Sequence, residues 1–153
     1  MQISIIAVGR MQRGPELDLM QQYLGRLPWK HSVTEIDIRK QAANAAERKA
    51  REAEKLAAAI PAGATVIALD ERGKALTSRA LAAKIDDWQA TGANQLAFLI
   101  GGADGLDASL AARADLKLAF GILTWPHMLV RAMLAEQIYR AWSINAGHPY
   151  HRD

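Results

Sequence analysis

The sequence predicts a single α/β domain in which a mostly parallel β-sheet is flanked by helices. Short apolar segments alternate with longer stretches of helical periodicity along all 153 residues. The apolar segments are nearly continuous in hydrophobic residues, as is typical of parallel strands buried on both faces. No linker, internal repeat or low-complexity stretch divides the chain, so we expect one domain over residues 1–153.

The first part of the chain is expected to form a strand, a helix and a second strand. Gln2–Val8 is an apolar run that ends at Gly9. Residues 15–27 repeat Leu and Met at helical spacing, which predicts a helix with one apolar face. Residues 32–38 alternate apolar and polar side chains imperfectly and predict the second strand.

The middle of the chain is expected to continue as helix, strand and helix. Residues 44–60 are rich in Ala, Glu, Lys and Arg, which are strong helix formers. Residues 64–69 are apolar with β-branched members, and predict a strand that enters a polar turn over residues 70–74. A helix is predicted over residues 78–89, with a Thr or Ser side chain as its N-cap.

The C-terminal third contains two further strands and two further helices by the same reasoning. Gln95–Ile100 is a continuous apolar strand that meets two glycines. An Asp that caps its first turn begins a short helix over residues 107–113. Leu116–Ala119 predicts a short strand, and the last helix is expected over His127–Asn145.

Apolar residues cover more than one face of this last helix, which is typical of a helix buried on more than one side. A partner subunit would supply the second surface, and a two-fold dimer is the most common arrangement. The alternative is a helix that lies centrally within the core of one chain.

Composition sets broad limits on function. The formal net charge is +3 and the isoelectric point is about 9.4, which permits contact with nucleic acid without demanding it. The chain has no cysteine, so disulfides, thiolate catalysis and cysteine-bound zinc are excluded. Neither an export signal nor a stretch approaching the roughly 20 apolar residues of a membrane helix is visible, so we expect a cytoplasmic protein without a membrane partner.

Three glycines, Gly101, Gly102 and Gly105, follow the fourth predicted strand. In a parallel sheet ligands bind at the carboxyl ends of strands, and glycines let a ligand approach the backbone closely. The alternative is a tight turn that binds nothing. The dinucleotide fingerprint is absent, and residues 9–14 lack the Lys and Ser/Thr of a phosphate loop, which disfavours NAD and ATP.

A second candidate segment, residues 121–127, is apolar but contains Gly and Pro. We expect a loop through buried surroundings, whose backbone amides and carbonyls need partners. An adenine edge would satisfy them, with Leu123 or Trp125 packed on the ring. The alternative is a buried connection satisfied by its own chain.

The tail places His148, Pro149, Tyr150, His151 and Arg152 in consecutive positions. Imidazole, phenol and guanidinium groups serve in proton transfer, base stacking and phosphate binding. A polar chain end without consequence is the alternative. A metal is not expected, because no third ligand accompanies the two histidines. Arg10 and Arg13, in the loop after the first strand, are candidates for contact with RNA.

Several motifs in this order resemble one family. They are Ala7-Val8-Gly9, Leu99-Ile100-Gly101-Gly102, Leu123-Thr124, Pro126-His127, Leu129-Val130-Arg131, Tyr139-Arg140-Ala141-Trp142-Ser143-Ile144 and His148-Pro149-Tyr150-His151-Arg152. The chain resembles, from end to end, the bacterial large-subunit (23S) ribosomal RNA pseudouridine N3-methyltransferases of the knotted SpoU–TrmD (SPOUT) superclass. The C-terminal third carries the most specific part of this resemblance.

The resemblance implies a C-terminal trefoil knot, a homodimer and S-adenosyl-L-methionine as cofactor. By position, the implied cofactor-binding residues are Leu69, Gly101, Gly102, Gly121, Ile122, Leu123, Thr124, Trp125 and Pro126. The chain departs from the family pattern at Ala103 and Asp104, where Pro and Glu are frequent, and at Trp125, where a smaller apolar residue is expected.

The reaction that the resemblance implies is methylation of N3 of a pseudouridine, with the assembled ribosome as the expected substrate. His148 or His151 is the candidate for assisting deprotonation of N3, Tyr150 for stacking or hydrogen bonding to the base, and Arg152 for holding a phosphate or the anionic base edge. Two other readings stay open: a ribosome-binding factor with a vestigial pocket, and a different small nucleotide-dependent enzyme.

Overall fold

Five parallel strands form one sheet in the order β2-β1-β4-β3-β5. The structure is a computed structural model that describes residues 1–38 and 44–152. The strands are β1 (Gln2–Val8), β2 (Lys30–Ile36), β3 (Thr65–Ala75), β4 (Gln95–Ile100) and β5 (Leu116–Ala119). The helices are α1 (Pro15–Arg26), α2 (Ala45–Ala59), α3 (Ser78–Ala90), α4 (Ala108–Ala112) and α5 (His127–Asn145). The predicted α/β class with a parallel sheet is confirmed.

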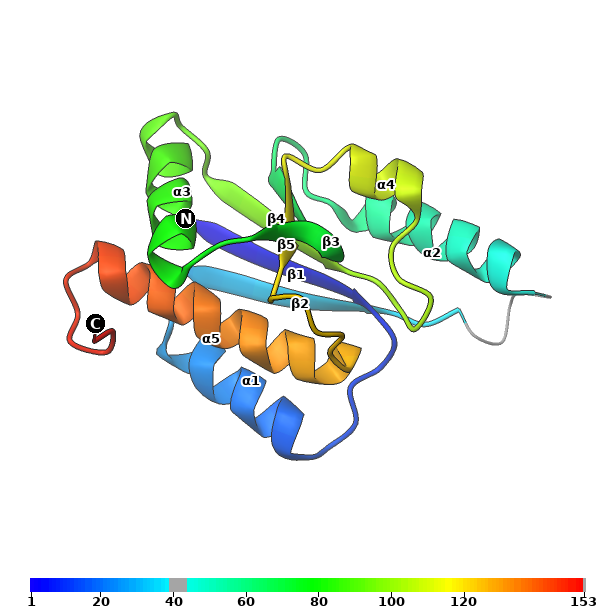
Figure 1. Cartoon of the computed structure of the whole chain (residues 1–153), viewed down its shortest axis with the longest axis horizontal. Helices are drawn as coiled ribbons and strands as arrows, with labels where there is room; N and C mark the ends of the chain where they lie inside the picture. The colour runs from blue at the N-terminus through cyan, green and yellow to red at the C-terminus, as the bar shows by residue number, and fades with distance from the viewer. Residues whose placement is uncertain (39–43, 153) are drawn as a thin grey trace.

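The helices cover both faces of the sheet (Figure 1). Helices α1, α3 and α5 pack together on one face, where Phe98 and Leu96 of β4 join their core. On the opposite face, α2 and α4 enclose a smaller core that contains Leu99 of β4. Successive residues of a strand point to opposite faces, so the continuous apolar run of β4 supplies both cores.

The long helix α5 lies in the middle of its layer, in contact with both α1 and α3. It is therefore covered by its own chain on two sides, which is the central position that the sequence analysis kept as an alternative to a partner subunit. Among the described residues no helix is both long and apolar enough to span a membrane. The threading of the C-terminal segment through a loop, which the family resemblance implies, stays a prediction.

The bounds of β2 and β3 differ most from the sequence predictions, which were residues 32–38 and 64–69. Strand β2 begins at Lys30 because its pairing with β1 starts there, opposite Gln2. The polar turn predicted over residues 70–74 is wrong in part, because β3 resumes pairing with β5 at Lys74 and Ala75 after an excursion. Gly73 makes this excursion possible, since a Cβ there would lie 2.7 Å from the backbone of Lys117.

Arg131 of α5 ties the helix to the loop that follows β1. Its side chain is 0% exposed, and its Nη2 donates to the carbonyls of Val8 and Gly9 at 2.7 Å each. Its Nη1 pairs with Glu35 at 2.9 Å, and the same Glu35 oxygen accepts from the amide of Met11 at 2.8 Å. One buried cation thus fixes the start of the loop that carries Arg10 and Arg13.

Replacing Arg131 with Leu is expected to lower the free energy of unfolding by about 3–5 kcal/mol. The substitution removes the cationic donor from the Glu35 carboxylate, which keeps only the Met11 amide, and from the carbonyls of Val8 and Gly9. Urea unfolding followed by circular dichroism measures the loss. The control is Arg13→Leu at an exposed position, where a change within about 0.5 kcal/mol is expected. Equal stability of the two variants would contradict the anchoring role of Arg131.

Candidate active site

A cleft of about 780 Å³ opens where β4 and β5 end and where β3 leaves its pairing with β4 after Leu69. Its lining includes these predicted cofactor-binding residues: Leu69, Gly101, Gly102, Gly121, Leu123, Thr124, Trp125 and Pro126. Ile122 is the exception, because its side chain is 98% exposed and lies outside the lining. The strand ends thus bring together segments that are far apart in the sequence, as parallel topology requires.

The glycine loop after β4 is folded tightly on itself. A Cβ on Gly101 would lie 2.5 Å from the carbonyl carbon of Gly105 and 2.6 Å from the nitrogen of Leu106. The amide of Gly105 donates to the carbonyl of Gly102 at 3.0 Å, and Gly105 adopts a φ of 75°. Gly101 is thus required by packing within the loop, and both Gly101 and Gly102 line the cleft.

Helix α2 holds the glycine loop from outside. Arg48 pairs with the Asp104 carboxylate at 2.8 Å, and Lys49 donates to the Asp104 carbonyl at 3.0 Å. The hydrogen bond to Asp104 raises the pKa of Arg48. The acid at position 104 therefore serves as an anchor for the loop in this chain, and Lys49 also lines the cleft.

Glu52 of α2 lies buried behind the same loop. A Cβ on Gly102 would lie 3.4 and 3.5 Å from the two carboxylate oxygens of Glu52. Burial raises the pKa of Glu52, and the Arg48 charge partly offsets that effect. The charged form of Glu52 is therefore less stable in the folded protein than in the unfolded chain.

Glu52→Gln is expected to raise the free energy of unfolding at pH 7 and to have little effect at pH 4. Because the folded pKa is raised from 4.5, the folded state holds the proton more tightly, so stability is lost as the pH rises above that value. Urea titrations of both proteins at the two pH values measure the difference. Glu54→Gln, exposed on the same helix, is the control and should change stability by less than about 0.5 kcal/mol. A variant less stable than the parent at pH 7 would contradict the assignment.

The prediction that residues 121–127 run through buried surroundings is wrong for the single chain. Leu123 is 64% and Trp125 is 38% exposed. The segment extends beyond the end of β5, where neither helix layer covers it. Trp125 donates from Nε1 to the Phe120 carbonyl at 3.0 Å, and Thr124 donates to Glu71 at 3.3 Å.

The backbone groups of Ile122, Leu123 and Thr124 make no hydrogen bond to any other residue in the part of the chain that the structure describes. The expectation that this loop offers backbone donors and acceptors is thus met, on an exposed rather than a buried path. A planar heteroaromatic edge placed in the cleft would find these groups available.

Charged groups in the cleft were missed by the sequence analysis. Asp70, Glu71 and Arg72 lie within β3, in the excursion between its pairing at Leu69 and its return to β5 at Lys74, and His127 begins α5 at the same edge. Their position immediately after a predicted strand was a usable signal, but the segment was interpreted as an ordinary polar turn. Together they give the cleft a polar rim of both charge signs above an apolar floor that contains Leu118 and Val130.

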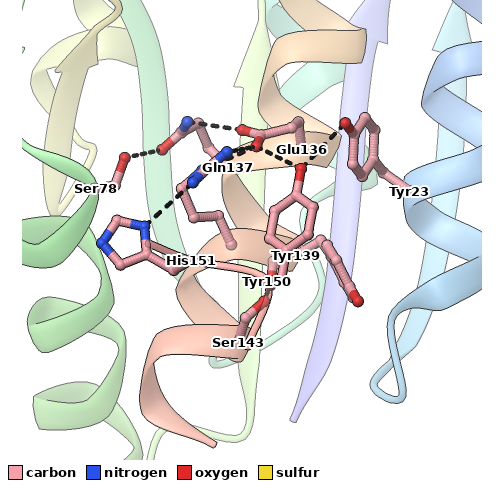
Figure 2. Close-up of polar contacts among 9 residues, drawn as sticks. Tyr23, Ser78, Glu136, Gln137, Tyr139, Ser143, Tyr150 and His151 are labelled. Atoms are coloured by element: carbon pink, nitrogen blue, oxygen red, sulfur yellow. Dashed lines mark hydrogen bonds and ion pairs between the residues drawn. The ribbon is translucent and has the colours of Figure 1, made fainter. Parts of the chain in front are cut away.

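The tail folds back on α5 through a network centred on Glu136 (Figure 2). Glu136 accepts from the Tyr150 hydroxyl at 2.9 Å and from Arg140 Nε at 2.9 Å. Arg140 Nη1 lies 3.2 Å from His151 Nδ1, and its guanidinium lies over the Tyr150 ring. Tyr23 of α1 lies 3.1 Å from the Tyr150 hydroxyl. Glu136 and Tyr23 were not predicted, although Glu136 is the one acid in the sequence of α5.

The tail residues do not reach the cleft of their own chain. His148, Pro149, Tyr150, His151 and Arg152 are all described, and none lines it. The cleft meets α5 at His127, whereas His151 is held at Arg140, about 20 Å farther along the axis at 1.5 Å per residue. The structure thus brings the predicted cofactor residues together and leaves the predicted catalytic residues as a separate cluster.

A second cavity of about 440 Å³ lies between these two groups. It shares Leu118, Ala119, Phe120 and Gly121 with the cleft, and Glu136 and Gln137 with the face of α5 on which the tail docks. The space beside β5 therefore extends from the cleft toward the Glu136 network.

Comparisons with known proteins agree with this architecture. A family described as "Predicted SPOUT methyltransferase" matches residues 1–151. The chain is 53% identical over 152 residues to the ribosomal RNA large subunit methyltransferase H of Rhodospirillum centenum, and 51% identical over 152 residues to the protein of that name from Paramagnetospirillum magneticum. Each match covers 99% of this chain and 99% of the relative.

Solved structures show the same fold at low sequence identity. A probable methylase family protein from Haemophilus influenzae Rd KW20 aligns with a TM-score of 0.60 and 10% identity over 99% of this chain and 70% of its own. TrmJ from Z. mobilis ZM4 aligns with a TM-score of 0.52 and 18% identity over 98% of this chain and 71% of its own. The family match over residues 1–151 and the 53% identity over 99% of both chains show that the chain belongs to the SPOUT methyltransferase family.

Proposed function

We propose that the protein is an S-adenosyl-L-methionine-dependent methyltransferase that modifies N3 of a pseudouridine in 23S ribosomal RNA, on the assembled ribosome. The observation that carries the proposal is the full-length identity of 53% to a relative named ribosomal RNA large subunit methyltransferase H. The strand-end cleft supports it independently, because it gathers the residues expected to bind the cofactor. A ribosomal substrate places the reaction in the cytoplasm.

The residues of the cleft fit S-adenosyl-L-methionine. The unpaired backbone groups of Ile122, Leu123 and Thr124 suit the hydrogen-bonding edge of adenine, and Leu69 with Val130 offers apolar contact. Gly102 lines the cleft, and a Cβ there would meet Val8 and Glu52. The polar rim suits the charged amino-acid portion of the cofactor. When bound, the cofactor supplies an electrophilic methyl group on a sulfonium.

The residues of the tail, 148–152, are the candidates for acting on the target base. The protein has to align N3 with the methyl group and stabilise the negative charge that develops on the base. Arg152 supplies a guanidinium for the phosphate or the anionic base edge, and the Tyr150 ring can stack on a base. These groups have to meet a cleft that their own chain does not bring to them.

A homodimer would resolve this separation, with the tail of one subunit acting at the cleft of the other. Ile122 and Leu123 are large apolar side chains that remain exposed in the single chain, beside the cleft. Exposed apolar side chains of this kind are typical of surfaces that a partner covers. The dimer also presents twice the surface to an RNA target that is recognised by shape.

Mixed dimers test this arrangement. Arg152→Ala removes a tail group, and Leu123→Glu places a charge in the cleft at an exposed position that folding tolerates. Each homodimer is expected to be inactive. Unfolding and refolding the two together should restore methyl transfer, because one intact tail then meets one intact cleft. A mixture as inactive as its components would contradict action across the dimer.

A further inference from the structure

The proton positions on the two tail histidines follow from their hydrogen-bond partners. The Nδ1 atom of His148 lies 3.2 Å from the backbone nitrogen of Tyr150. A backbone N–H only donates, so this Nδ1 accepts. A neutral imidazole has one donor and one acceptor, and the proton of His148 therefore sits on Nε2.

His151 has the same tautomer for a different reason. Its Nδ1 lies 3.2 Å from Arg140 Nη1. A guanidinium has only donors, so Nδ1 of His151 accepts and its proton also sits on Nε2. Arg140 is fixed in place by Glu136, and that bond raises the pKa of Arg140, so the guanidinium remains a donor over the whole physiological range.

The third polar group of the tail, the Tyr150 phenol, is also held as a donor. A carboxylate only accepts, so the Tyr150 hydroxyl gives its proton to Glu136, at 2.9 Å. Burial, together with the bonds to Tyr23 and Glu136, raises the pKa of Tyr150. The bond to Glu136 therefore holds the Tyr150 phenol as a donor.

We propose that the tail acts on its target base only through donors: Nε2–H of His148 and of His151 stabilises negative charge on the base, and neither histidine accepts the N3 proton. This inference rests on the proposed function and assigns roles that the sequence left open between the two histidines. The basic nitrogen of each ring is already engaged, by a backbone amide in one case and by a guanidinium in the other.

The reaction balances without a protein base. N3 of the imide loses its proton to water or hydroxide, and its electron pair forms the new bond to the methyl carbon. The bond between that carbon and sulfur breaks, and sulfur keeps the electron pair as a neutral thioether. Donors aimed at the carbonyl oxygens beside N3 lower the cost of the imide anion, in the manner of an oxyanion hole.

Further charged and aromatic groups lie around the tail among the described residues. Tyr139 packs against His148 and Arg140 contacts His151, while Tyr23 and Glu136 contact the Tyr150 hydroxyl between them. Among these the carboxylate of Glu136 already accepts from Tyr150, Arg140 and Gln137.

Nitrogen-15 NMR of the labelled full-length protein tests the tautomers without any activity measurement. Long-range spectra of the four histidines are assigned by the signals lost in His148→Gln and His151→Gln. We expect Nδ1 of both rings to be unprotonated and Nε2 to carry the proton. A proton on Nδ1 of either ring would overturn the proposal for that residue. This result does not depend on whether the protein methylates RNA.

Single-turnover methyl transfer as a function of pH tests the catalytic consequence. The wild-type rate should rise about tenfold per pH unit from pH 6 to 8.5, with no plateau above the ordinary histidine pKa of about 6.5. Glutamine keeps an N–H donor near the Nε2 position, so His151→Gln should lose about threefold and His151→Ala about 100-fold. A plateau above pH 6.5, or a Gln variant as inactive as the Ala variant, would overturn it. No label from wild type at any pH would instead contradict the proposed function.

Discussion

Arg152→Ala is expected to lower the single-turnover rate of methyl transfer by about 100- to 1000-fold, which is the usual cost of removing one donor to a developing anion. Affinity for S-adenosyl-L-methionine should stay within about twofold, because Arg152 is exposed and lies outside the cleft of its own chain. Arg152→Lys should recover only part of the loss, since an ammonium lacks the planar fork that binds a phosphate or base edge at two points.

Calorimetric titration of the cofactor and rapid-quench methyl transfer separate the two effects. The matched control is Arg51→Ala, an exposed arginine in an i,i+4 pair with Glu47 on α2. That variant should keep its rate within about twofold, because an exposed pair of this kind contributes little. Unchanged turnover in Arg152→Ala, or a loss explained entirely by weaker cofactor binding, would contradict the role given to Arg152.

Gly101→Ala is expected to abolish measurable cofactor binding and to lower the free energy of unfolding by about 2–3 kcal/mol. The new Cβ would lie 2.5 Å from the Gly105 carbonyl carbon and 2.6 Å from the Leu106 nitrogen. Both obstacles are backbone atoms, so the glycine loop has to open rather than a side chain rotate. Opening displaces Gly102 and the adjoining cleft wall.

Gly25→Ala supplies the matched control for this substitution. Gly25 lies in α1, and a Cβ there meets nothing within 4 Å. The change should stabilise the protein by about 0.5–1 kcal/mol, because Gly costs that much in a helix interior relative to Ala. Cofactor affinity should be unaffected. A Gly101→Ala protein that binds the cofactor as the parent does would contradict the packing role of the loop.

Local signals predicted most of the secondary structure. The predicted caps are present: Thr77 accepts from the amide of Ala80, and Asp107 accepts from those of Ser109 and Leu110. Capping depends on residues within one turn, so sequence reveals it. The end of β3 at Ala75 depends instead on pairing with β5, more than forty residues later in the chain, which no local pattern reports.

The sequence could predict those parts of the candidate site that lie at the carboxyl ends of strands. Leu69, Gly102 and Thr124 line one cleft because parallel strands bring their carboxyl ends to one edge, and their role in cofactor binding stays a prediction. The exposure of Leu123 was not predictable, since an apolar composition does not say whether a loop is covered by its own chain. The contact of Tyr150 with Glu136 depends on how the tail folds back, which is a tertiary property.

The measurement that tests the central claim most directly is transfer of radiolabelled methyl from S-adenosyl-L-methionine to ribosomes that lack the modification, compared with naked 23S ribosomal RNA. We expect label on N3 of a pseudouridine, preferentially with ribosomes, and its loss in Arg152→Ala. No label on either substrate, despite measurable cofactor binding, would contradict the proposed substrate and leave the fold and cleft intact. Absence of both label and cofactor binding would contradict methyl transfer itself and favour a ribosome-binding factor.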